Sequence, residues 1–242
     1  MNEDDKPILF CERRGVFAFL IFIGGFFGAY TFILKGGVFC NAQTANCVLF
    51  AISLGERNWS KAAYLLLPIF AYLLGAVVSE YAYKSERRKH HIFRFETEFI
   101  LFESLITIII GFIPDSYPVQ ICQVTINFIA SMQYNTFRQA DKIPMATTFC
   151  TNHIRQTGIY LVKLFQEPGN GNNKRRLNTH LTMLFSFILG GILSTICCLK
   201  FSSKAIWVSS LLLIILSVLL IHADLTEDKG KLAIPAHGQK TF

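Results

Sequence analysis

Two apolar stretches of the chain carry clusters of polar side chains that are suited to binding a solute. The first, Gly36–Ser53, contains four of them within six positions: Asn41, Gln43, Thr44 and Asn46. The second, Ile143–Phe165, contains four more: Thr151, Asn152, His153 and Arg155. Because an unpaired polar group in hydrocarbon costs several kcal/mol, a helix that only faces lipid has no use for so many amides.

Each stretch opens with a helix breaker, Gly36-Gly37 or Pro144, and turns helical only near a threonine. We therefore predict two broken membrane segments whose helices begin near Thr44 and Thr151. The free N–H groups at a helix start carry partial positive charge and bind anions. The predicted substrate-binding site comprises six residues at these two starts: Thr44, Asn46, Thr151, Asn152, His153 and Arg155. The alternative interpretation is that these side chains only cap backbone groups.

Charged and titratable residues in apolar sequence indicate coupling to an ion. Arg155 is suited to neutralise an anionic solute and His153 to relay a proton, although Arg155 would equally reach the membrane surface from a shallow loop. Glu103 is suited to couple transport to protons or to pair with Arg155. The alternative is that it only faces a water-filled crevice. The predicted coupling or pathway residues are Glu103, Gln120, Gln123 and Asn127. The last three share one helical face, which would equally serve as polar contacts between helices.

No metal, cofactor or enzyme motif accompanies these residues. Of the seven cysteines, Cys40, Cys47 and Cys150 lie in the broken stretches, but the chain has neither a CxxC nor an HxxxH spacing. The GxSxG, HExxH and P-loop patterns are absent as well. We therefore expect no metal, no cofactor and no enzymatic activity.

The composition excludes an ordinary soluble domain. Of the 242 residues, 52% are hydrophobic and 16% are charged, and the mean hydropathy is +0.42. The net charge of +7 comes without a nucleic-acid-binding motif and fits basic loops beside anionic lipid. We expect the lipid bilayer as a partner and no nucleic acid. No small-residue cleavage site follows the first apolar run, which we expect to remain as a membrane helix.

Six apolar runs have about the 20 residues that a membrane span needs. They cover 15–34, 62–83, 93–113, 119–137, 178–199 and 205–222. The predicted fold is an all-α, polytopic transmembrane helical bundle with six full spans and two discontinuous, re-entrant segments. It forms a single membrane domain, 1–242, which we divide into repeat one (15–83), a linking helix (93–113), repeat two (119–199), a last helix (205–222) and a polar tail (225–242) that we expect to be mobile.

The two halves of the chain share one order of elements, with Thr44 matching Thr151. Small residues also recur every four positions in both halves, at Ala71, Gly75 and Ser79 and at Ser186, Gly190 and Ser194. If the broken segments are re-entrant, only five of the 23 basic residues lie outside: Lys35, Arg57, Lys61, Lys200 and Lys204. This satisfies the positive-inside rule, places both termini in the cytoplasm and predicts an inverted repeat, a feature of many transporters. The alternative is that each broken stretch crosses the membrane as an extended strand and a half-helix, which the charge count disfavours.

A Gly-rich first helix is followed by Gln43-Thr44-Ala45-Asn46 and then by Leu74-Gly75-Ala76. The second half has Met132-Gln133-Tyr134-Asn135 before its turn and Thr151 after Pro144. This order, over residues 15–222, resembles the YoaK family of bacterial multi-pass membrane proteins (domain of unknown function 1275), whose signature is Thr-Gly-Asn. Ala45 and Asn152-His153 replace glycine or small residues of the family pattern, which narrows the backbone conformations at both turns. The resemblance implies a bacterial inner-membrane protein without an established activity.

These features predict a small transporter or permease for a small solute, with anions favoured by the two helix starts. The rival prediction is a non-transporting membrane scaffold or partner-binding subunit, whose small-residue faces serve oligomer contacts and whose polar residues are structural. A homodimer is compatible with both. A transporter predicts a hydrated cavity at the broken segments, whereas a scaffold predicts a dry, well-packed junction.

Overall fold

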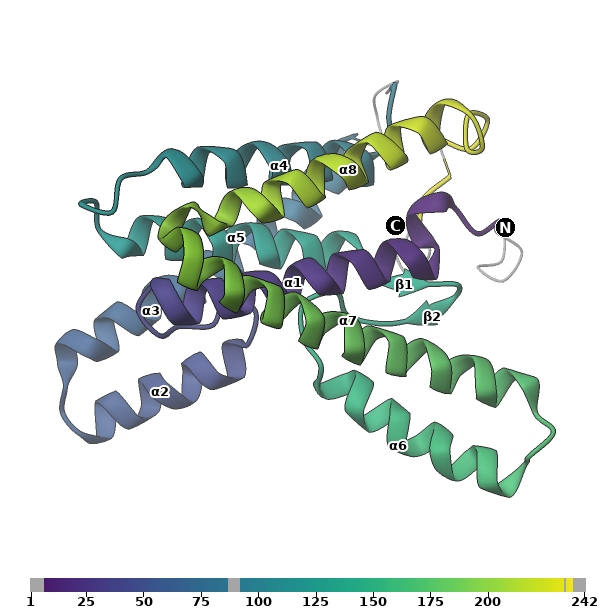
Figure 1. Ribbon diagram of the computed structural model, residues 1–242, viewed down its shortest axis with the longest axis horizontal. Coiled ribbons are helices and arrows are strands. Elements are labelled where there is room, and N and C mark those ends of the chain that lie inside the picture. The colour runs from purple at the N-terminus through teal and green to yellow at the C-terminus, as the bar shows by residue number, and fades with distance from the viewer. Residues whose placement is uncertain (1–6, 87–91, 233, 237–242) are drawn as a thin grey trace.

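The computed structural model describes residues 7–86, 92–232 and 234–236, and most of them are helical, as predicted (Figure 1). The helices are α1 (Arg14–Leu34), α2 (Gln43–Gly55), α3 (Trp59–Glu86), α4 (Phe95–Phe112), α5 (Val119–Thr136), α6 (Thr151–Gln166), α7 (Gly171–Phe201) and α8 (Ile206–Leu225). Two short 3-10 helices, η2 (Phe10–Glu12) and η3 (Ser202–Ala205), precede α1 and α8. Each of the six apolar runs coincides with a helix, which confirms the all-α prediction.

Three described segments are long and apolar enough to cross a membrane. They are Arg14–Leu34, Trp59–Tyr83 and the run Gly171–Leu225, which holds α7 and α8. Large apolar side chains such as Phe70, Phe185 and Leu211 are exposed on α3, α7 and α8. Such faces suit contact with lipid, where an apolar surface carries no desolvation cost.

Both predicted breaks in the helices are present. Gly36 and Gly37 have φ angles of 83° and 69°, a left-handed conformation that glycine adopts without steric cost, and the chain stays non-helical until Gln43. The second break includes an unpredicted antiparallel hairpin of β1 (Gln139–Ala140) and β2 (Ile143–Pro144). The amide of Asp141 in its turn donates to the carbonyl of Glu12 at 2.8 Å, a long-range contact that no local pattern predicts.

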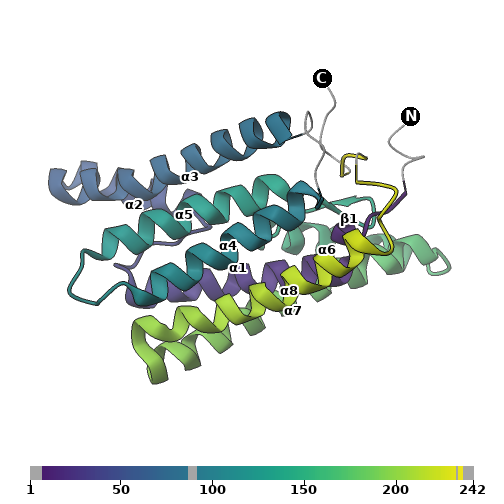
Figure 2. The same ribbon diagram turned by 90° about the horizontal axis from the view of Figure 1, so that it is seen from above.

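The helices pair across the two halves of the chain. Helix α1 packs along α7, α3 along α5, and α4 along α8, while α2 and α6 fold back on α3 and α7. Figure 2 shows the resulting interleaved bundle from above. The indole N–H of Trp207 in α8 donates to the carbonyl of Ile108 in α4 at 3.2 Å, so the expected linking helix and last helix lie against each other.

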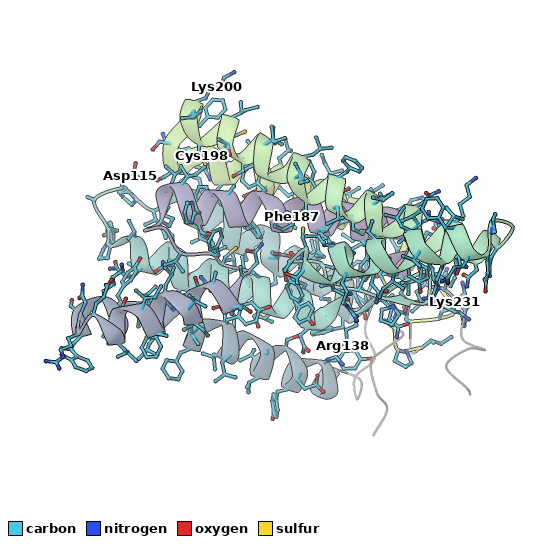
Figure 3. All side chains as sticks on the ribbon, turned by 90° about the horizontal axis from the view of Figure 1, so that it is seen from below. Asp115, Arg138, Phe187, Cys198, Lys200 and Lys231 are labelled. Atoms are coloured by element: carbon cyan, nitrogen blue, oxygen red, sulfur yellow. The ribbon has the colours of Figure 1, made fainter. Side chains whose placement is uncertain are left out.

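The closest helix crossings occur at small residues. A Cβ atom on Gly25 would lie 2.0 Å from the carbonyl oxygen of Phe187, and one on Gly190 would lie 1.9 Å from that of Phe22. Gly75 of α3 meets α5 in the same way. Figure 3 labels Phe187 near mid-length of the bundle. The predicted small-residue faces are therefore the places where backbones touch.

The C-terminal tail packs against the end of the bundle where the N-terminal segment also lies (Figure 1). Arg94 donates from Nη1 to the carbonyl of Lys231 at 2.9 Å and from Nη2 to that of Ile234 at 2.8 Å. The buried carboxylate of Asp228 accepts from the amide of Phe10 at 2.8 Å. Residues 226–232 and 234–236 therefore make packing contacts that the sequence did not predict, because a buried arginine pairs with the backbone of the tail. Residues 237–242 lie outside the described residues.

Replacing Gly190 by alanine should lower the thermal stability of the protein, because the new methyl group overlaps the backbone of Phe22 and forces α1 away from α7. We expect the Tm in detergent micelles to fall by about 5 °C. The control is Gly158→Ala in α6, where the new methyl group meets open space and alanine favours the helix. An unchanged Tm in Gly190→Ala would contradict the close crossing.

Candidate functional site

The two short helices begin near the middle of the molecule and run outward in opposite directions (Figure 1). Helix α2 begins at Gln43, one residue before Thr44, and α6 begins at Thr151 itself, as the sequence predicts. Both threonine side chains are exposed. The N-cap residues Ala42 and Cys150 make no side-chain hydrogen bond to the helix starts.

The first broken stretch is held together by its own amides. The buried Asn46 donates from Nδ2 to the carbonyl of Phe39 at 2.7 Å and accepts at Oδ1 from the amide of the same residue at 3.3 Å. It also donates to Oε1 of Gln43 at 3.0 Å. Gln43 in turn donates to Oδ1 of Asn127 at 2.8 Å. These bonds give Asn46 a structural role, because they pair backbone groups that the break would leave open.

The polar stripe of α5 joins three segments. Gln123 donates from Nε2 to the carbonyl of Lys35, at the end of α1, over 3.2 Å. Asn127 accepts the hydrogen bond from Gln43 of α2. Both residues are fully buried, whereas Gln120 is partly exposed. Gln123 Oε1 and Ser131 Oγ are buried without a hydrogen-bond partner. The stripe therefore supplies contacts between helices and also leaves acceptor oxygens inside the bundle.

Glu103 of α4 is fully buried, and neither of its carboxylate oxygens has a hydrogen-bond partner in the structure. The suggested partner Arg155 is exposed and donates instead to Oδ1 of Asn152 at 3.2 Å. A buried carboxyl group without a cation or donor is stable only when it is neutral. This setting keeps Glu103 as a candidate coupling group.

The two broken stretches meet at Gly24 of α1. Asn41 of the first stretch donates from Nδ2 to the carbonyl of Gly24 at 3.0 Å. From the second stretch, the carbonyl oxygen of Thr147 would lie 2.6 Å from a Cβ on the same glycine. The hydrogen bonds of Asn46 nevertheless stay within the first stretch. Those of Asn152 and His153 stay with the second stretch and α7. The six predicted residues therefore form two groups.

His153 has a partner that the sequence did not indicate. Its Nδ1 lies 3.0 Å from Nδ1 of His180 on α7, and its Nε2 lies 3.0 Å from the carbonyl oxygen of Ala146. Both imidazoles are buried. His180 lies 27 residues further along the chain inside an apolar run, and a lone histidine there gives no signal of a pair.

A pocket of about 350 Å³ lies at the start of α6. Its polar residues come from α5, the segment after it and α6: Asn135, Arg138 and Asn152. Its apolar residues are Tyr134, Pro144, Met145, Ala146 and Phe149, and the rings of Tyr134 and Phe149 pack 4.9 Å apart. Of the predicted site residues, only Asn152 lines this pocket. Arg138, which also donates to Glu80 at 2.7 Å, directly follows an apolar run and resembles an ordinary helix-end residue in the sequence.

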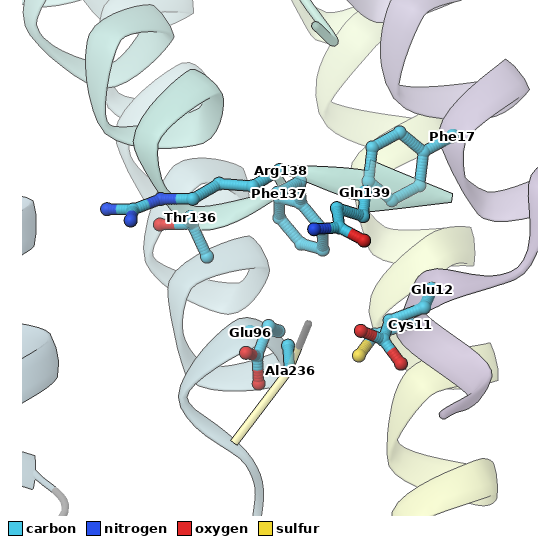
Figure 4. Close-up of a pocket in the computed structure, with 9 residues that line it drawn as sticks. All are labelled: Cys11, Glu12, Phe17, Glu96, Thr136, Phe137, Arg138, Gln139 and Ala236. Carbon is cyan, nitrogen blue, oxygen red and sulfur yellow. The ribbon is translucent and has the colours of Figure 1, made fainter. Parts of the chain in front are cut away.

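A second, much smaller pocket of about 10 Å³ lies where the N-terminal segment meets the tail (Figure 4). Cys11, Glu12, Glu96 and Ala236 contribute to its wall. Burial, together with the nearby carboxylates of Glu96 and Glu12, raises the pKa of the Cys11 thiol well above its ordinary range. A thiol in this state is a poor nucleophile and a poor metal ligand. Among the described residues, no group of three or more His, Cys, Asp or Glu side chains is placed to hold a metal ion.

Residues 16–219 match the model of a family described as protein of unknown function (DUF1275). The chain belongs to this family. The match spans both broken stretches and nearly all of α1 through α8, which confirms the resemblance seen in the sequence. No curated protein and no solved structure matches the chain. With its apolar helices, this DUF1275 protein is an integral membrane protein.

Replacing Asn46 by alanine should destabilise the protein, because both backbone polar groups of the partly buried Phe39 lose their partner. An unsatisfied buried group costs about 1–3 kcal/mol, which corresponds to a fall in Tm of about 3–8 °C for a chain of this size. Thr44→Ala, two residues earlier and exposed, is the matched control and should leave Tm nearly unchanged. Equal effects of the two substitutions would refute a structural role for Asn46.

Proposed function

We propose that this DUF1275 protein transports a small organic anion across the bacterial inner membrane and binds it in the pocket at the start of α6. The observation that carries this proposal is the pocket of about 350 Å³, a volume typical of small-molecule sites. Arg138 and Asn152 are suited to an anionic group, and the N-terminal end of α6 adds partial positive charge. Tyr134 and Phe149 are suited to an apolar body attached to that group.

The arrangement of the helices supports a transporter. Broken helices whose starts point to the middle of a membrane domain recur in transporters with inverted repeats. The pairings of α1 with α7, α3 with α5 and α4 with α8 are those of two interleaved units, 14–112 and 119–225. In this proposal α4 is the last helix of the first repeat and α8 is the last helix of the second. Neither helix then lies outside the repeats. The opposite directions of α2 and α6 (Figure 1) support an inverted relation between the units.

The proposed topology has six full spans, two re-entrant segments and both termini in the cytoplasm. In Figure 3, Arg138 and Lys231 lie on one side of Phe187 along the bundle, and Asp115 and Lys200 lie on the other. At the end with the termini, Arg13 and Arg94 contact the tail. The positive-inside rule assigns a basic end to the cytoplasmic side. The pocket, which includes Arg138, then opens toward that side.

The main alternative is a membrane scaffold that transports nothing. The saturated amide network of Asn46 and Gln43 favours a purely structural first stretch. However, a scaffold was expected to use its small-residue faces for oligomer contacts, and Gly25, Gly75 and Gly190 are already used within the chain. A homodimer would have to form through the apolar outer faces of the helices.

A thermal-shift screen of the purified protein should find stabilisation by monocarboxylates that carry an aliphatic or aromatic body, and little by chloride, sulfate or phosphate. A ligand at about 100 times its Kd contributes about 2.7 kcal/mol, which is a rise in Tm of about 5–10 °C. Asn152→Leu should abolish the shift, because it removes the polar group from the pocket at similar side-chain volume.

Lys174→Gln is the matched control, because Lys174 is exposed on α7 and does not line the pocket. It should retain the shift. Any stabilising anion should then exchange across proteoliposomes in a counterflow assay. Stabilisation without counterflow would favour a binding subunit, and no stabilisation by any carboxylate would refute the proposed solute class.

Reporter tags should place both termini and the segment 87–91 in the cytoplasm, and the turn 56–58 outside. This result follows if each broken segment enters and leaves the membrane on the same side. The chain then crosses the membrane once through each of α1, α3, α4, α5, α7 and α8. Topology-dependent fluorescence and phosphatase fusions, made pairwise at each position, measure it. A cytoplasmic signal at the termini with an external one at 87–91 would mean crossing broken segments and would remove the inverted repeat.

A further inference from the structure

The buried pair of His153 and His180 lies directly behind the proposed solute pocket. His153 contacts the carbonyl of Ala146, and Ala146 lines the pocket together with Asn152, the residue next to His153. His180 supports His153 from α7. The pair therefore connects one wall of the pocket to a long helix that packs along α1.

The contacts of the pair fix where its protons lie. A carbonyl oxygen only accepts, so His153 carries a proton on Nε2 and, when neutral, offers a lone pair at Nδ1. His180 must then donate from its own Nδ1 across the 3.0 Å contact. One additional proton is accommodated on Nε2 of His180 without loss of this bond. A second additional proton would place two N–H groups face to face and separate the rings.

The surroundings of the pair oppose the second charge. On α6, the ring of Tyr160 stacks parallel to His180 with 6.0 Å between ring centroids, and the ammonium of Lys163 lies over the same tyrosine. On α7, Arg176 donates to the hydroxyl of Tyr160 at 3.1 Å. The segment 145–150 presents the Ala146 carbonyl, and its titratable side chain is Cys150. Because the facing charges are cationic, the pair has capacity for a single proton, and an anion in the pocket would favour its uptake.

We propose that the His153–His180 pair binds a proton that is coupled to the anion in the adjacent pocket, so that the protein is a proton–anion symporter. This inference rests on the proposed function. Coupling between two sites is reciprocal, so proton uptake must raise anion affinity by the same factor by which the anion favours proton uptake. Ala146 and Asn152 are the direct structural link between the two sites.

The first test needs no solute. Thermal unfolding of the full-length protein is measured from pH 8 to pH 5 for the wild type, His153→Gln, His180→Gln and the control His222→Gln, whose histidine is exposed on α8. The unfolded chain binds more protons than the folded pair, so stability must fall as the pH falls. We expect the wild type and His222→Gln to lose about 3 °C more in Tm at acid pH than either pair variant.

The second test uses the monocarboxylate that stabilises the protein most. Its affinity for the wild type should rise about tenfold per unit fall in pH, as uptake of one proton per anion requires, and should be nearly independent of pH in His180→Gln. Binding that is equally independent of pH in the wild type would overturn the coupling and leave the transporter proposal standing. If the loss of Tm at acid pH persists in both pair variants, the symport proposal is wrong. If no carboxylate binds at all, both the symport proposal and the proposed function are wrong.

Discussion

The arrangement of the whole domain depends on the absence of side chains at Gly24 and Gly25 of α1. A methyl group on Gly24 would collide with the carbonyl of Thr147 in the second broken stretch, and one on Gly25 would collide with the backbone of Phe187 in α7. The carbonyl of Gly24 also receives the Asn41 amide of the first stretch. Two adjacent glycines thus allow the second broken stretch and α7 to approach one helix. Such close approach increases the dispersion contacts between helices. These contacts matter in a membrane, where the hydrophobic effect contributes little to helix association.

Most of the fold could be predicted because its signals are local. The apolar runs have the length of helices, Gly36-Gly37 and Pro144 stop them, and the small residues at Gly75 and Gly190 have the spacing of a helix face. The β1–β2 hairpin and the packed tail were missed for a common physical reason. Their partners, Glu12 and Arg94, lie far away along the chain, and polar contacts between distant segments leave no periodic pattern.

The candidate site was predictable only in part. The positions of the two helix starts follow from the breakers, and Asn152 does line a pocket. The pocket itself depends on Arg138 and Phe149, whose roles arise from how α5, the hairpin and α6 meet. His180 likewise becomes informative only when α6 folds back on α7. Sequence spacing cannot reveal such pairs, because their distance is set by tertiary packing.

The two broken stretches differ in how they use their polar groups, although the packing around them follows one pattern. In the first stretch, Asn46 and Gln43 satisfy each other, the local backbone and Asn127. Such closed networks make a segment rigid. In the second stretch, Asn152 and the backbone around Ala146 line a pocket, and the polar support comes from a titratable pair behind it. In the proposed transporter, the rigid first stretch would be the fixed surface that alternating access needs, and the second stretch would be the part that moves against it as proton and solute bind.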